Sequence, residues 1–163
     1  MSFSTSAIRR STASGLAAGI RLAIPVAMAA LGSVISEKAG VLNLGVEGMM
    51  LMGAFFGILA ADKFGSWWIG LLCGILSGGL MATLHAVISI HLRADQIVGG
   101  TAINFLALGL TGYLYIDIYG DTGTPTDIST IPSIHLSWLE GVPFFGTVVG
   151  DLNLMIWIAL LLI

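Results

Sequence analysis

The chain has 163 residues, of which 56% are hydrophobic and 9% are charged, and its mean hydropathy is +0.99. A soluble domain carries about 25% charged residues, so this composition indicates a membrane protein and excludes most soluble enzymes. Its 6 basic and 9 acidic residues give a net charge of −3, which provides no basic surface for nucleic acid. The one cysteine, Cys73, excludes an intrachain disulfide and a cysteine zinc cluster.

Four apolar segments are long enough to cross a bilayer, which takes about 20 residues. They cover residues 16–35, 41–61, 67–90 and 97–116. A fifth apolar run begins near residue 152 and continues to residue 163, where about ten residues make a helix of about 15 Å, half the hydrocarbon thickness. We therefore predict an all-α polytopic transmembrane helical bundle, with four full spans and the start of a fifth. We expect residues 1–163 to form a single transmembrane domain that is incomplete at its C-terminus.

The charges give conflicting evidence on orientation. The longest loop, residues 117–151, contains five acids and no Lys or Arg, which favours an outside position by the positive-inside rule. Arg9 and Arg10 would then also lie outside, against the same rule. Charge alone therefore leaves both orientations open.

Glycines recur at four-residue spacing in the second and third segments. Small residues at this spacing let the backbones of two helices in lipid approach closely. We predict that they form a helix-packing surface, and a homodimer contact is the alternative. The residues are Gly53, Gly57, Gly70, Gly74 and Gly78.

Two polar residues, Asn43 and Glu47, lie inside the second apolar segment. An ionisable group at membrane depth costs about 2.5–3.5 kcal/mol by insertion scales, so it is a candidate for function. Glycines at positions 40, 45 and 48 weaken a helix here, and a broken helix is tolerated only inside protein or along a watery cavity. We predict that Asn43 and Glu47 line a transport path. The alternative is that Glu47 forms an internal hydrogen bond or lies near the membrane surface.

A second polar group begins the fourth segment, where Gln96 and Asn104 lie on one helical stripe with Gly100 between them. The Asn104 side chain can hydrogen-bond either a ligand or a neighbouring helix, and we favour the neighbouring helix. His85 and His91 lie at and beyond the end of the third segment, where an interfacial or structural role is expected for both.

Enzymatic chemistry finds little support. Ser77 and His85 are eight residues apart on one helix, about 12 Å in rise, and cannot act as nucleophile and base. Residues 40–48 lack the Gly-Lys-Ser/Thr ending of a phosphate-binding loop. We predict no catalytic residue, no metal site and no cofactor in this chain.

Two stretches resemble a known family. Residues 29–54, which read AALGSVISEKAGVLNLGVEGMMLMGA, and residues 96–112, which read QIVGGTAINFLALGLTG, resemble the permease subunits of ABC importers for nucleosides and simple sugars. These permeases belong to a superfamily that includes ribose and branched-chain amino-acid permeases. The resemblance implies the N-terminal part of a longer permease, in the cell membrane of a bacterium or archaeon, with the long acidic loop outside.

The resemblance also implies partners. A second permease subunit, identical or related, would complete the translocation path, cytoplasmic ABC ATPase subunits would hydrolyse ATP, and an extracytoplasmic binding protein would deliver the substrate. The path residues we expect from the polar pattern are Asn43, Glu47, Asn104 and Gln96. Three alternatives stay open: a proton-coupled secondary transporter that uses Glu47, a branched-chain amino-acid permease, and a membrane scaffold whose polar residues only hold helices together.

Overall fold

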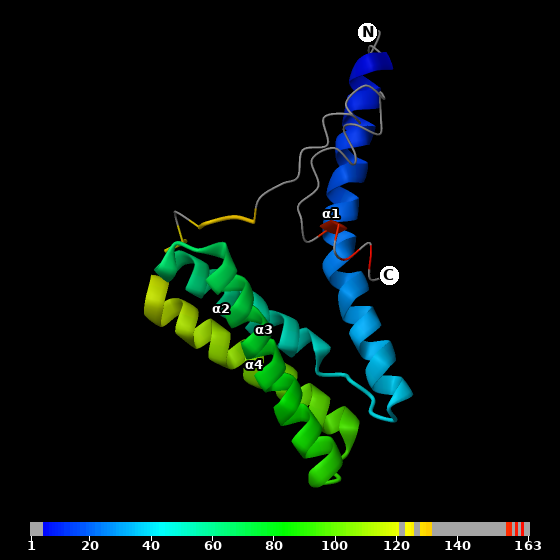
Figure 1. Cartoon of the computed structure of the whole chain (residues 1–163), viewed down its shortest axis with the longest axis vertical. Coiled ribbons are helices and arrows are strands. Elements are labelled where there is room, and N and C mark those ends of the chain that lie inside the picture. Colours follow the sequence, from blue (N-terminus) through cyan, green and yellow to red (C-terminus); the bar gives the residue numbers. More distant parts are fainter. Residues whose placement is uncertain are drawn as a thin grey trace. The chain divides into compact units, whose positions relative to one another are not determined.

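The computed structural model describes residues 5–120, 123–125 and 128–131, with residues 156, 157, 159 and 161 near the C-terminus. Every regular element in this described part is a helix, which confirms the all-α prediction (Figure 1). The chain divides into two units, one made of residues 1–31 and 131–163 and the other of residues 32–130. The prediction of a single transmembrane domain stays a prediction.

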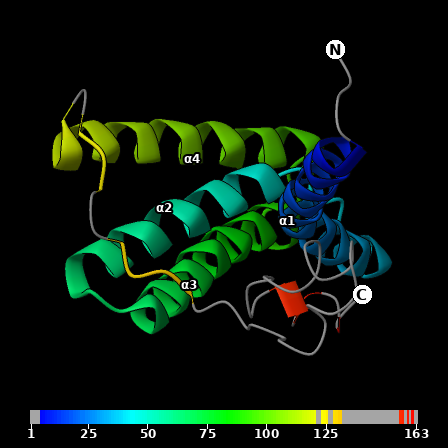
Figure 2. The same cartoon turned by 90° about the horizontal axis from the view of Figure 1, so that it is seen from above.

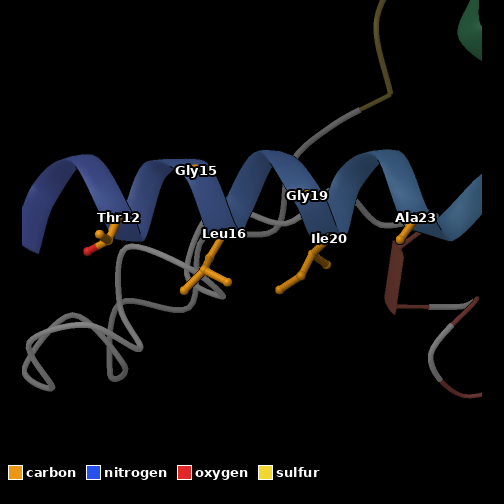
Figure 3. A pocket seen from close by; sticks show the side chains of 6 residues that line it. All are labelled: Thr12, Gly15, Leu16, Gly19, Ile20 and Ala23. Atoms are coloured by element: carbon orange, nitrogen blue, oxygen red, sulfur yellow. The ribbon is translucent and has the colours of Figure 1, made fainter.

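The first helix, α1, runs over Thr5–Lys38 and contains Pro25. Its part Ala18–Lys38 is long and apolar enough to cross a membrane, in agreement with the first predicted span. Along α1 within the first unit lies an open hollow of about 590 Å³, and its side chains share one face of the helix (Figure 3). Thr12 provides the only hydroxyl in this lining, so the hollow offers little to a polar ligand. The lining residues are Thr12, Gly15, Leu16, Gly19, Ile20 and Ala23.

The second unit contains three packed helices that lie side by side in both views (Figures 1 and 2). They are α2 (Val46–Phe64), α3 (Trp67–Ala86), which continues as the π-helix η1 (Val87–His91), and α4 (Gln96–Tyr119). The helix α2 packs most extensively on α3 and also on α4, while α3 and α4 touch each other less. The buried side chains between them are Met49, Met52, Met81, Ile103 and Ala107.

The predicted second span, residues 41–61, is the main correction. Residues 39–45 are not helical, and α2 begins only at Val46 and ends at Phe64. Three charged residues, Glu47, Asp62 and Lys63, lie within these 19 positions, and α2 is not among the helices apolar enough to count as a span. The break itself agrees with the expectation that the local glycines weaken the helix.

The other spans agree with expectation as far as they are described. The stretches Trp67–His91 and Gln96–Tyr119 both qualify as membrane spans by length and composition. Of the predicted fifth span, the four described residues are helical, and the rest lies outside the described residues, as does most of the loop at 117–151. Three of the four predicted full spans are therefore found in the described part of the chain.

The predicted packing glycines lie between α2 and α3. A Cβ atom added to Gly70 would meet the carbonyl oxygen of Gly57 at 2.7 Å, and one added to Gly74 would meet that of Gly53 at 2.9 Å. Gly78 is less tightly placed, because its Cβ would lie 3.4 Å from the Met49 carbonyl oxygen. Since these neighbours are backbone atoms, the helices cannot approach this closely if either glycine carries a side chain.

The Gly74→Ala substitution is expected to destabilise the protein by about 1–3 kcal/mol, the usual cost of overpacking a well-packed contact. The matched control is Gly79→Ala on the same helix, where an added Cβ meets no atom within 4 Å, so the higher helix propensity of alanine should leave stability equal or greater. Thermal unfolding of the detergent-solubilised protein measures both. Equal melting temperatures for the two variants would contradict this packing.

Candidate functional site

The first element of the candidate site is the non-helical stretch 39–45, called here the unwound segment. Gly40 has φ +83°, a left-handed conformation that favours glycine and ends α1. Its N–H donates to the Glu37 carbonyl at 2.9 Å, and the Val41 N–H donates to the Ser36 carbonyl at 3.1 Å. The Ser36 hydroxyl donates back to the Val41 carbonyl at 2.9 Å. These bonds turn the chain away from the axis of α1.

Side chains from two helices then take over the hydrogen bonding of the unwound segment. The Leu42 N–H donates to Oε1 of Gln96, at the start of α4, at 2.7 Å. The Leu42 carbonyl lies 3.4 Å from Nε2 of His85 on α3. An unpaired backbone group costs several kcal/mol in the bilayer core, so these contacts replace the bonds that a continuous helix would make.

The Asn104 side chain binds both ends of the transition from the unwound segment to α2. Its Nδ2 donates to the Leu44 carbonyl at 2.9 Å, and its Oδ1 accepts from the Gly48 N–H at 2.7 Å. The Gly48 N–H lies in the first turn of α2, where the helix leaves its own N–H groups without partners. Asn104 therefore contacts the neighbouring element, which is the alternative that we favoured for it.

Glycines allow this close approach between the unwound segment and α4. A Cβ on Gly100 would lie 2.8 Å from Leu44 Cβ and 2.9 Å from the Gly45 nitrogen. A Cβ on Gly48 would lie 2.8 Å from the carbonyl oxygen of Ile103. Between Gln96 and Asn104 the helix rises about 12 Å, so the unwound segment runs along the first two turns of α4. Because α4 is long enough to span the membrane, this stretch of backbone lies at the depth of a membrane helix.

The two remaining candidates make few contacts with the protein. The Asn43 Nδ2 approaches the sulfur of Met49 at 3.7 Å, and its Oδ1 is buried without a hydrogen-bond partner in the described structure. Glu47 lies in the first turn of α2 and is exposed. A negative charge at that position also stabilises the helix through its dipole. The structure thus separates Gln96 and Asn104, which bind backbone, from Asn43 and Glu47, which keep free acceptor atoms.

Sequence reasoning did not assign His85 to this site. The side chain is 2% exposed, and it contacts the backbone rather than the membrane surface. A signal for it was available, because Met81, His85 and Ser89 follow one another at four-residue spacing and all three are buried. We had followed the small-residue stripe of α3 through Ala82 and Ala86 instead.

The described residues contain no group of three His, Cys, Asp or Glu side chains that could hold a metal ion. The arrangement is instead a set of amide, imidazole and carboxylate groups around extended backbone within a helical bundle. Such groups can form reversible hydrogen bonds with an uncharged polar ligand. Discontinuous helices that expose backbone at membrane depth are characteristic of transporters.

Comparison with known proteins agrees with this chemistry. Residues 15–163 match the family described as branched-chain amino acid transport system, permease component. The chain is 38% identical over 132 residues to the guanosine ABC transporter permease protein NupQ of Bacillus subtilis, covering 77% of this chain and 41% of the relative. It is 37% identical over 141 residues to the putative glucose ABC transporter permease protein TsgC13 of Haloferax volcanii, covering 83% and 43%.

A third relative is the nucleoside ABC transporter permease protein NupC of Lactococcus lactis, 35% identical over 130 residues, covering 76% of this chain and 41% of the relative. The chain therefore spans about two fifths of the length of the curated relatives it matches. No solved structure matches it. Since the family match covers nearly the whole sequence, the chain belongs to the family of branched-chain amino acid transport system permease components.

Proposed function

We propose that this chain is part of the membrane-spanning permease subunit of an ATP-driven ABC importer for nucleosides or simple sugars. The observation that supports this most directly is the unwound segment, which lies at membrane depth and leaves acceptor atoms of Asn43 and Glu47 without protein partners. Relatives whose names refer to guanosine, nucleosides and glucose support the choice of substrate class.

The mechanism that we propose is alternating access. The substrate moves along a path beside the unwound segment, where the Asn43 amide and the Glu47 carboxylate form weak hydrogen bonds to its polar groups. A neutral ligand suits this path, because a bound charge would need a paired charge at membrane depth. Gln96 and Asn104 contribute indirectly, since they hold the backbone that presents Asn43.

The proposed partners divide the work of transport. A second permease subunit, identical or related, completes the path, and cytoplasmic ABC ATPase subunits hydrolyse ATP, so this chain is not itself an enzyme and needs no cofactor. A binding protein delivers the substrate from outside the cell membrane of a bacterium or archaeon. In this orientation the acidic loop at 117–151 lies outside, and residues 92–95 lie on the cytoplasmic side.

Uptake of radiolabelled guanosine and glucose tests this function in cells that carry the permease. We expect saturable uptake of at least one of them, and its loss when the partner ATPase gene is deleted. Uptake that survives the deletion and follows the proton gradient would contradict the proposal and favour a secondary transporter that uses Glu47. Uptake of leucine but of neither test substrate would favour a branched-chain amino-acid permease.

Alanine substitutions separate path residues from structural ones. Asn104→Ala leaves the Leu44 carbonyl and the Gly48 N–H without their partners, at about 1–3 kcal/mol for each buried group, so we expect less folded protein in the membrane. Asn43→Ala removes a side chain whose only recorded hydrogen bond is the 3.7 Å contact with a sulfur atom, so we expect normal expression with reduced uptake.

Expression and uptake are measured separately for both variants, on immunoblots of membranes and in the transport assay. Glu47→Gln provides a third comparison, because it keeps the shape of a side chain that is exposed in this structure and removes only the charge. Full uptake by Asn43→Ala, at normal expression, would remove Asn43 from the path.

A further inference from the structure

The Leu42 peptide is held from both sides by side chains of different helices. Gln96 of α4 accepts from the Leu42 N–H at 2.7 Å, and His85 of α3 lies 3.4 Å from the Leu42 carbonyl oxygen. A typical N–H···O hydrogen bond measures 2.7–3.2 Å, so the contact with Gln96 is tight and the contact with His85 is loose. The unwound segment is therefore fixed on the α4 side and weakly held on the α3 side.

Unpaired polar atoms gather on the α3 side. His85 is 2% exposed, and its second ring nitrogen, Nδ1, has no hydrogen-bond partner in the described structure. Ser89, four residues further along and inside η1, is 7% exposed, and its hydroxyl also has no partner. Residues four apart on a helix lie on one face, so both atoms belong to the buried side of α3 and η1.

Such atoms are costly in this arrangement, because each buried polar group without a partner loses its hydrogen bonds to water. Natural proteins pair nearly all such groups. The local helix geometry supports the same conclusion, since Ser89 lies in a π-helical turn, and such turns are frequent at functional sites. Two unpaired groups beside a loosely bound carbonyl indicate that this face has room for a second hydrogen-bonded position of the unwound segment.

We propose that His85 is a positioning residue for transport. In the described state its Nε2–H donates to the Leu42 carbonyl and holds the unwound segment against α3. In a second state the segment shifts along this face, and its backbone groups pair with the Ser89 hydroxyl and with Nδ1 of His85. Gln96 remains the fixed point of this movement. The inference rests on the proposed function, because it gives the unwound segment two positions in one transport cycle.

The neutral imidazole suits this role, since it has one donor and one acceptor nitrogen. With Nε2 as the donor to Leu42, Nδ1 is an acceptor for a backbone N–H. The Ser89 hydroxyl can donate to a backbone carbonyl. Together the two side chains offer one partner for each kind of backbone group, which the displaced Leu42 peptide or its neighbour Asn43 can use.

Thiol labelling at position 44 tests the proposal without relying on transport. Leu44 is 45% exposed, and Cys73 is the only native cysteine, so the Leu44→Cys reporter can be placed in a Cys73→Ser background. The rate of reaction with a small maleimide is measured in the purified full-length permease. His85→Leu, which removes the donor, is expected to change this rate about fivefold, the effect of one typical hydrogen bond on an equilibrium.

Two further variants act as controls. His85→Gln keeps an N–H donor and should restore a rate close to that of the parent protein. His91→Gln makes the same substitution at an exposed histidine of η1 and should leave the rate unchanged. A folded His85→Leu variant that labels at the parent rate would overturn the proposal, and so would a His91→Gln variant that changes the rate as much as His85→Leu.

Ser89→Ala keeps the proposal testable if His85→Leu does not fold. It removes the partner of the second state and leaves the first state intact, so we expect unchanged labelling at rest, a lower maximal uptake rate and an unchanged KM. Unchanged uptake would overturn the proposal. If the substrate class is wrong, guanosine and glucose uptake are both absent while the labelling difference between His85→Leu and His85→Gln persists, which separates that failure from failure of this inference.

Discussion

The central constraint on this structure is that backbone N–H and C=O groups at membrane depth must find partners inside the protein. A continuous helix meets it by itself, but residues 39–45 are not helical. Gln96 and Asn104 on α4 and His85 on α3 provide partners for Leu42 and Leu44 instead. The short α2, the close approach to α4 and the buried polar side chains all follow from this substitution of side-chain bonds for helical ones.

Two kinds of contact fix α2 in place. On the α3 side, Gly53, Gly57, Gly70 and Gly74 bring the backbones together without side chains between them. On the α4 side, Asn104 binds its first turn, and the Tyr119 hydroxyl donates to the Asp62 carboxylate at 3.0 Å near its other end. The helix itself is thus held along both neighbours, while the unwound segment before it is held by a few side-chain bonds. A motion of the bundle would therefore be accommodated in the segment more easily than in the helix.

The helical class and three of the spans could be predicted from the sequence, because length and apolarity decide whether a segment crosses a membrane. The glycines at 40, 45 and 48 also indicated a break. Its extent could not be predicted, since hydropathy treats residues 41–61 as one apolar run and does not distinguish extended from helical backbone. The partners of Gln96 and Asn104 were equally out of reach, because they are backbone groups of residues 54 to 60 positions away. His85 was missed because a lone histidine near a span end has no distinctive pattern.

The central claim is that the unwound segment lies directly on α4, and stability measurements on two glycine variants test it most directly. A Cβ on Gly100 would meet Leu44 and Gly45 at 2.8–3.0 Å, whereas one on Gly109 of the same helix meets nothing within 4 Å. The account predicts that Gly100→Ala lowers the melting temperature of the purified permease and that Gly109→Ala leaves it unchanged or raises it. Equal melting temperatures for the two variants would mean that the segment does not approach α4 in this way.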